Sequence, residues 1–187
     1  MARPRSDDKR SAVLAAGVRV FAGQGLSAPT ALIAKESGVS NGTLFVYFPT
    51  KVDLLNQLYV ELKAEMGAAT LLGMKVGSLR EQCSSMWTNW LNWSTKFPEK
   101  RRVLALLEVE AEVTAVSRTV GHQAMSPIAQ LLDQVRQQGP MRDMPLSFVV
   151  GLMTSIADAT IDFMIREPAN GERFRSEGFE ALWRIVS

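Results

Sequence analysis

The sequence has very little of what metal centres and covalent cross-links need. It contains one cysteine, Cys83, and one histidine, His122. A single cysteine excludes an internal disulfide bond and is typical of a reducing compartment, so the sequence predicts a cytoplasmic protein. One thiol and one imidazole also give no ligand set for a transition metal, and we expect no metal and no cofactor.

Catalytic signatures and long apolar runs are missing as well. The chain has no phosphate-binding glycine loop, no nucleophile elbow and no Cys–His pair, so we expect no enzyme. No stretch approaches the roughly eighteen consecutive apolar residues of a membrane span. The charged start, MARPRSDDKR, is not followed by an apolar core and predicts neither a secretory signal nor a membrane partner. Glu108, Glu110 and Glu112 alternate along a predicted helix and are therefore expected to face solvent.

The charge balance carries little information by itself. The formal net charge is +2; residues 1–55 contain seven Lys or Arg and four Asp or Glu, and residues 56–187 contain fourteen and fifteen. The positive excess therefore lies at the N-terminal end, where a basic surface attracts phosphate groups. Because that excess is modest, a nucleic-acid partner has to be argued from the local pattern.

Apolar residues recur throughout the chain at the spacing of helices, and Gly and Pro separate the periodic segments. Hydrophobic residues make up 47% of the 187 positions and charged residues 21%, which is typical of a globular protein. We therefore expect an all-α chain of about nine helices, at 8–24, 30–36, 41–47, 51–72, 79–95, 98–115, 122–138, 145–166 and 171–186.

The segment at 30–51 has the pattern of a helix-turn-helix. Gly38 can adopt the positive φ of a tight turn, and Ser40 can cap the short helix that follows. Pro49 disfavours helix at the residue before it, and Thr50 can cap the long helix that comes next. In a helix-turn-helix, the second helix lies in the major groove of DNA with its first residues toward the base edges.

The short helix at 41–47 is suited to close contact with DNA. Small polar residues begin it, and Gly42 removes a side chain that would hold the backbone away. Leu44 and Phe48 lie four residues apart and are expected to anchor the buried side. The ammonium group of Lys51 and the first N–H groups of the next helix can share a phosphate. The predicted DNA contacts are Arg3, Arg5, Thr30, Ser40, Asn41, Gly42, Thr43, Phe45, Tyr47 and Lys51.

The string IAKESGVSNGTLFVYFPTK at 33–51 resembles the signature of the TetR family of bacterial transcriptional regulators, and Phe21 with Gly25 matches the way that family's first helix ends. The resemblance covers about the first third of the chain. It implies a regulator, usually a repressor, that is relieved by a small ligand. The chain differs from the usual pattern at Phe45, where Tyr is common, and at Val52, where an acidic residue is common. The segment between that glycine and the string is also one residue shorter.

The basic N-terminal arm with Arg3 and Arg5 can follow the phosphate backbone or enter a minor groove. A solvated tail is the alternative. Together with the helix-turn-helix, the arm forms a predicted DNA-binding domain at 1–50. A long helix joins it to a predicted effector-binding and dimerisation domain at 51–187.

The helix at 145–166 is apolar on two sides, which favours a dimer because a helix of this kind needs burial on both. A protein that binds short DNA sites is usually a two-fold dimer, with half-sites about 34–36 Å apart. One stripe contains Val149, Leu152, Ile156, Ala159 and Phe163. The second contains Val150, Met153, Ala157, Ile161 and Met164. Packing of both stripes within one chain is the alternative. The predicted dimer contacts are Val149, Leu152, Ile156, Phe163, Phe179 and Trp183.

The middle of the chain is rich in Trp and Met, side chains that line adaptable apolar pockets but also fill cores. For each residue taken alone, core packing is the simpler interpretation, and Cys83 is expected to be a small core residue. As a group, in a chain that resembles a ligand-gated family, they predict an apolar or aromatic effector. The predicted effector contacts are Met66, Cys83, Met86, Trp87, Trp90, Leu107 and Met125.

The sequence therefore predicts a homodimeric regulator, most simply a repressor, that binds a palindromic double-stranded DNA operator and is released by a small effector. One alternative is a constitutive DNA-binding dimer without small-molecule gating. Another is a carrier or enzyme for an apolar small molecule. Salt-dependent, sequence-selective binding to a palindromic duplex would exclude the second.

Overall fold

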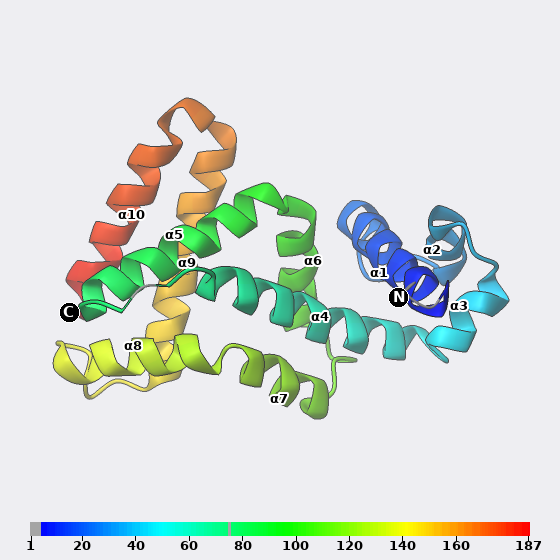
Figure 1. The fold of residues 1–187 in the computed structure, drawn as a ribbon, viewed down its shortest axis with the longest axis horizontal. Helices are drawn as coiled ribbons and strands as arrows, with labels where there is room; N and C mark the ends of the chain where they lie inside the picture. Colours follow the sequence, from blue (N-terminus) through cyan, green and yellow to red (C-terminus); the bar gives the residue numbers. More distant parts are fainter. Residues whose placement is uncertain (1–4, 75) are drawn as a thin grey trace. The chain divides into compact units, whose positions relative to one another are not determined.

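The computed structural model describes residues 5–74 and 76–187, and these residues form helices and no strand (Figure 1). The all-α class predicted from the sequence is confirmed. The elements are α1 (Arg5–Gln24), α2 (Thr30–Ser37), α3 (Asn41–Tyr47), α4 (Lys51–Leu71), α5 (Leu79–Lys96), α6 (Pro98–Glu108), α7 (Ala115–Ala124), α8 (Ser126–Gln138), α9 (Leu146–Arg166), the 3-10 turn η1 (Pro168–Asn170) and α10 (Gly171–Val186).

The helices form two compact units. The N-terminal unit contains the described residues up to Ala64 together with Phe97–His122, and the C-terminal unit contains Glu65–Lys96 and Gln123–Ser187. Packing therefore groups α6 and α7 with the first three helices, although they follow α5 in the sequence. The domain boundary predicted after residue 50 separates the expected DNA-binding part from the expected effector-binding and dimerisation part. It stays a prediction.

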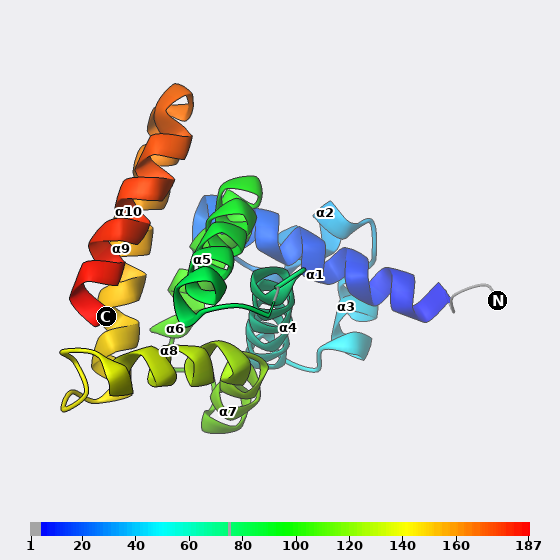
Figure 2. The ribbon, with the colours of Figure 1, turned by 60° about the vertical axis from the view of Figure 1, so that its left-hand side comes forward.

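In the N-terminal unit, α1 packs against α2, α3 and α6. Figure 2 shows α1, in dark blue, lying across the two short helices. Val13 and Phe21 of α1, Ile33 of α2 and Leu44 of α3 are fully buried. These side chains come from three helices too short or too polar to be stable alone, so the shared core holds the helix-turn-helix in shape.

In the C-terminal unit, α5, α8, α9 and α10 enclose a second core that includes Trp87, Leu91 and Ile161. α9 and α10 lie side by side, joined by the short turn at η1 (Figures 1 and 2). The predicted break around Pro168 is present. Gly178 of α10 allows a close approach, because a Cβ atom there would lie 2.4 Å from Thr160 Oγ1.

The region 98–138 differs from the prediction. α6 ends at Glu108 rather than near residue 115, and α7 is a separate helix that the sequence prediction missed. Thr114 starts α7, because its hydroxyl accepts a hydrogen bond from the Ser117 N–H at 3.2 Å. His122 is exposed and lies in the last turn of α7, whereas the predicted helix at 122–138 would begin at this residue.

In the part of the chain that the structure describes, one helix, α9, is long and apolar enough to cross a membrane by length and composition alone, with a mean hydropathy of 1.6 over eighteen residues. The sequence contains no uninterrupted apolar run of this length, because Asp158 and Asp162 interrupt the apolar residues of α9. Core helices of globular proteins pass the same test. The side of α9 that faces its own unit contains Met153, Ala157 and Ile161, which are buried.

Candidate nucleic-acid interface

The turn between α2 and α3 is built as its sequence predicts. Gly38 adopts the left-handed conformation at φ 70°, and its N–H donates to the carbonyl groups of Ala34 and Lys35. Ser40 then caps α3, since its hydroxyl accepts a hydrogen bond from the Thr43 N–H at 3.1 Å. Glycine at the left-handed position and a Ser cap together fix where α2 ends and α3 begins.

The two sides of α3 differ sharply in burial. Leu44 and Phe48 are buried and attach the helix to its unit. Thr43 and Tyr47 are half-buried along its flank. The side that remains exposed to solvent carries Asn41, Gly42, Phe45 and Val46. A helix held from one side with its other side free is the arrangement that a groove of DNA can accept.

The start of α4 is tightly organised. Phe48 has an extended backbone before Pro49, which ends α3. Thr50 and Asp53 cap each other's N–H groups, at 3.1 Å to the threonine hydroxyl and 2.9 Å to the carboxylate. The predicted cap at Thr50 is therefore confirmed. Lys51, the first residue of α4, is half-buried with its Nζ 6.0 Å from the centre of the Phe21 ring.

The structure places the predicted DNA contacts as follows. Ser40, Asn41, Gly42, Thr43, Phe45, Tyr47 and Lys51 lie on the continuous segment formed by the turn, α3 and the start of α4. Thr30 is the half-buried first residue of α2, with Pro29 rather than Thr30 in the cap position. Arg3 lies outside the described residues. Arg5 begins α1, and its side chain also lies outside the described part of the chain.

A polar network that the sequence analysis missed ties α4 to the loop between α6 and α7. The Asn56 side-chain amide donates to Glu112 O at 2.8 Å and accepts from the Thr114 N–H at 2.8 Å. Arg118 donates to the backbone carbonyl groups of Glu108 and Glu110, both at 2.8 Å. These contacts join residues far apart in sequence, and no local motif indicates them.

Glu108 is the centre of an ionic cluster, so the expectation that it simply faces solvent is wrong. Its carboxylate pairs with Lys63 and lies 4.0 Å from Arg118. The Tyr59 hydroxyl donates to the same carboxylate at 3.4 Å. Burial, reinforced by the negative charge of Glu108, raises the pKa of Tyr59 to about 12. Tyr59 therefore remains a neutral donor at physiological pH. Within the described residues, no three His, Cys, Asp or Glu side chains cluster as a metal site requires.

Comparison with known proteins shows which family the helix-turn-helix segment matches. The model of the bacterial regulatory proteins of the tetR family matches residues 13–58, which span α1 to the first turns of α4. A putative tetR family transcription regulator from a Shewanella species is 27% identical, with a TM-score of 0.84 over 95% of this chain and 97% of that chain. Residues 13–58 thus match the N-terminal segment of the TetR family, and the whole chain resembles a regulator of that family in fold.

Two further structures of TetR-family regulators match over nearly the whole chain. A transcription regulator from Marinobacter aquaeolei is 25% identical, with a TM-score of 0.87 over 99% of this chain and 98% of that one. A TetR-like regulator from Mycobacterium smegmatis, solved in complex with proflavine, is 16% identical, with a TM-score of 0.69 over 94% and 95%. The fold of TetR-family transcription regulators thus extends over nearly the whole chain, and the helix-turn-helix lies in the segment that the family model matches.

The predicted effector contacts lie mainly in the core of the C-terminal unit. Met66, Cys83, Met86 and Trp87 are buried, and Trp90 and Met125 are half-buried. The Trp87 indole N–H donates to Arg175 O at 3.0 Å, a bond within the unit. Leu107 is fully buried and belongs to the N-terminal unit. Contact of these residues with an effector stays a prediction.

The reactivity of the Cys83 thiol tests whether the core of the C-terminal unit is closed to solvent. Burial raises the pKa of this thiol to about 11, so only on the order of one molecule in ten thousand carries the reactive thiolate at neutral pH. We expect iodoacetamide to alkylate the native regulator more than about 100-fold more slowly than the urea-unfolded chain. Mass spectrometry of timed samples measures both rates. Fast, stoichiometric labelling of the native protein would contradict the buried position.

The predicted dimer contacts divide between the inside and the outside of the C-terminal unit. Val149 and Phe179 are buried in its core. Leu152, Ile156 and Trp183 are half-buried, and Phe163 is 44% exposed. The inward side of α9 thus runs through Val149 as well as Met153, Ala157, Ile161 and Met164, whereas the sequence prediction had grouped Val149 with the outer stripe.

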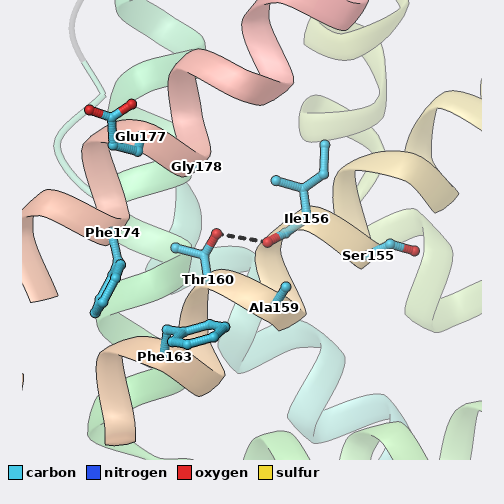
Figure 3. A pocket seen from close by; sticks show the side chains of 8 residues that line it. All are labelled: Ser155, Ile156, Ala159, Thr160, Phe163, Phe174, Glu177 and Gly178. Atoms are coloured by element: carbon cyan, nitrogen blue, oxygen red, sulfur yellow. Dashed lines mark hydrogen bonds between the residues drawn. The ribbon is translucent and has the colours of Figure 1, made fainter. Parts of the chain in front are cut away.

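An open, mainly apolar groove of about 480 Å³ lies between α9 and α10 (Figure 3). The rings of Phe163 and Phe174 lie 5.5 Å apart at one end of it. The Thr160 hydroxyl is bonded to Ile156 O at 2.7 Å, so it adds no free donor to the groove. Its lining residues are Ser155, Ile156, Ala159, Thr160, Phe163, Phe174, Glu177 and Gly178.

Proposed function

We propose that this chain is a cytoplasmic repressor that binds a palindromic DNA operator as a homodimer and leaves it when a small apolar or aromatic effector binds. The observation that carries the proposal is the free side of α3, continuous with Lys51 and the N-terminus of α4. The similarity to TetR-family regulators supplies the wider context.

The phosphate contacts in this proposal come from the start of α4 and from Tyr47 at the end of α3. The first N–H groups of α4 carry a partial positive charge, and the ammonium group of Lys51 adds a full one beside them. Tyr47 is half-buried on the same segment, and we propose that its hydroxyl group donates to a phosphate oxygen. These groups fix the position of α3 in the groove but carry no sequence information.

A second copy of the chain is proposed to cover the outer side of α9 and α10. Ile156, Phe163 and the apolar groove lie on that side, and an apolar surface of this kind normally marks an interface. A dimer also explains why α9 is apolar enough to resemble a membrane span. The two α3 helices of such a dimer would then bind half-sites related by two-fold symmetry.

The groove gives the dimer a specific test. We expect Phe163→Asp to convert the dimer to a monomer of 20.6 kDa, because the change places a charge in an apolar contact. Ile165→Asp is the matched control, since Ile165 is equally exposed, at 44%, but does not line the groove. Sedimentation velocity measures the mass of each variant. A Phe163→Asp protein that remains dimeric would contradict this interface.

Gating by an effector is proposed to act through α4, which starts at the DNA-binding segment and ends beside the core of the C-terminal unit. A ligand that shifts this helix would change the spacing of the α3 helices, with a coupling of about 1–3 kcal/mol or 5–150-fold in affinity. The Trp- and Met-rich core favours aromatic ligands. The relative that was solved with proflavine, a planar aromatic cation, supports this class.

A constitutive DNA-binding dimer is the second candidate, and the closed core favours it. Cys83, Met86 and Trp87 are at most 4% exposed, so an effector would have to displace packed side chains to reach them. Such a protein would bind its operator with the same affinity whatever small molecule is present.

One experiment separates these possibilities. Duplexes enriched from a random library by the purified protein should contain an inverted repeat, and two chains should bind each duplex. A panel of planar aromatic compounds, beginning with proflavine, is then added to the complex. Release by one of them supports the gated repressor, unchanged affinity with all of them supports the constitutive binder, and failure to enrich any sequence would overturn DNA binding itself.

A further inference from the structure

The free side of α3 is unusually apolar for a surface that reads base edges. Val46 is 79% exposed and Phe45 is 38% exposed, although neither packs into the core of the N-terminal unit. Both lie one turn after Gly42, at the positions three and four residues later, so they share its side of the helix. Exposed Val and Phe on a seven-residue helix do nothing for folding, which points to a contact outside the chain.

Gly42 supports the same conclusion independently. Its φ is not positive, and a Cβ atom built there would meet only Ser40 Oγ, at 3.9 Å. The fold therefore requires no glycine at this position, although glycine in a helix is unfavourable relative to alanine. Because Gly42 has no side chain and lies beside two exposed apolar side chains, another molecule can approach the backbone of α3 closely.

The polar groups on this helix have limited capacity for reading bases. The hydroxyl groups of Ser40 and Thr43 are bonded to each other at 2.9 Å, and the serine oxygen also caps the helix. Asn41 is the remaining side chain on the free side that can form hydrogen bonds with a base. In the major groove, Asn pairs with adenine, and the C5-methyl group of thymine is the apolar feature that a base presents there.

We propose that the side chains of Val46 and Phe45 read thymine C5-methyl groups. Val46 is thereby a residue that determines operator specificity. The inference rests on the proposed DNA-binding function and adds the class of base that α3 selects. Each half-site should contain thymine opposite Val46, close to the Gly42 backbone.

Deoxyuridine provides the test because it differs from thymidine only by that methyl group. Each thymine of the enriched duplex is replaced in turn by deoxyuridine, in both half-sites together. We expect at least one replacement to weaken binding about 4-fold per half-site, as the loss of one buried methyl group implies. Other thymines should tolerate the replacement.

The variants assign the effect to a side chain. In Val46→Ala, the same deoxyuridine replacement should change affinity less than about 2-fold, because the methyl group has already lost its partner. Val109→Ala is the matched control: Val109 is 84% exposed at the end of α6, and this variant should keep the full sensitivity. Val46 is exposed, so Val46→Ala should fold normally, which thermal unfolding checks.

The outcomes distinguish this inference from the function on which it rests. A protein that enriches no duplex would overturn both. A protein that binds its enriched duplex normally and is indifferent to deoxyuridine at every thymine would overturn only the methyl-reading role. Sensitivity that persists unchanged in Val46→Ala would overturn the assignment to Val46.

Discussion

Gly178→Ala is expected to lower the free energy of unfolding by about 1–3 kcal/mol, the usual result of overpacking a core. The added Cβ atom would lie 2.4 Å from Thr160 Oγ1 and 3.0 Å from Trp87 Cζ2. The Trp87 ring is only 1% exposed and cannot move into solvent without opening the core. Urea unfolding followed by tryptophan fluorescence measures the effect, since all four tryptophans belong to the C-terminal unit.

Gly171→Ala is the control for this prediction, because Gly171 begins the same helix and a Cβ atom there would meet nothing within 4 Å. Its substitution should be neutral or slightly stabilising. Thr160→Ala removes both atoms of Thr160 that the new Cβ would strike, so it should partly restore the Gly178→Ala protein. Equal stability of the two glycine variants would mean that α9 and α10 do not approach as closely as described.

Lys51→Met is expected to weaken operator binding by on the order of tenfold or more and to reduce the slope of log affinity against log salt by about 2 for the dimer. Each chain loses one phosphate contact, and each contact contributes about 0.9 to the slope. Methionine keeps an apolar stem near Phe21, which separates loss of charge from loss of packing.

Lys96→Ala serves as the control for Lys51→Met. Lys96 is an exposed lysine on α5 of the C-terminal unit, outside the proposed interface. It should leave both affinity and salt slope unchanged. If Lys51→Met also leaves the slope unchanged, the ammonium group of Lys51 does not neutralise a phosphate, and the N-terminus of α4 is wrongly assigned.

The helix-turn-helix was predictable because its boundaries depend on neighbouring residues. Gly38 ends α2, Ser40 caps α3, Pro49 ends it, and Thr50 caps α4. Each of these effects acts within one helical turn of the chain. The positions of these helices therefore follow from the sequence without knowledge of the tertiary fold.

The region after α5 was not predictable in the same way. Asn56 bonds to the backbone at Glu112 and Thr114, more than fifty residues later, and Arg118 holds the end of α6. These contacts form only once α4, α6 and α7 have packed together. The local sequence alone therefore indicated a helix that continues to residue 115, and it gave no sign of α7 as a separate helix.

The orientation of α9 about its own axis could not be predicted from the sequence either. Both of its stripes are apolar, so hydrophobic periodicity cannot decide which one faces the core. Packing against Trp87 and Phe179 places Val149 and Met153 inside and leaves Phe163 exposed. For the same reason, the Trp and Met residues of the core could not be divided into packing residues and effector contacts.

The central claim, that α3 with the start of α4 reads a specific DNA sequence, is tested most directly by the affinity of the wild-type protein for two duplexes. One is the enriched palindrome and the other a scrambled duplex of the same composition, each titrated by fluorescence anisotropy at about 50 and 200 mM salt. We predict binding to the palindrome at least about 1,000-fold tighter, with affinity for both falling steeply as salt rises. Equal affinity for the two duplexes, or binding that salt does not weaken, would contradict the account.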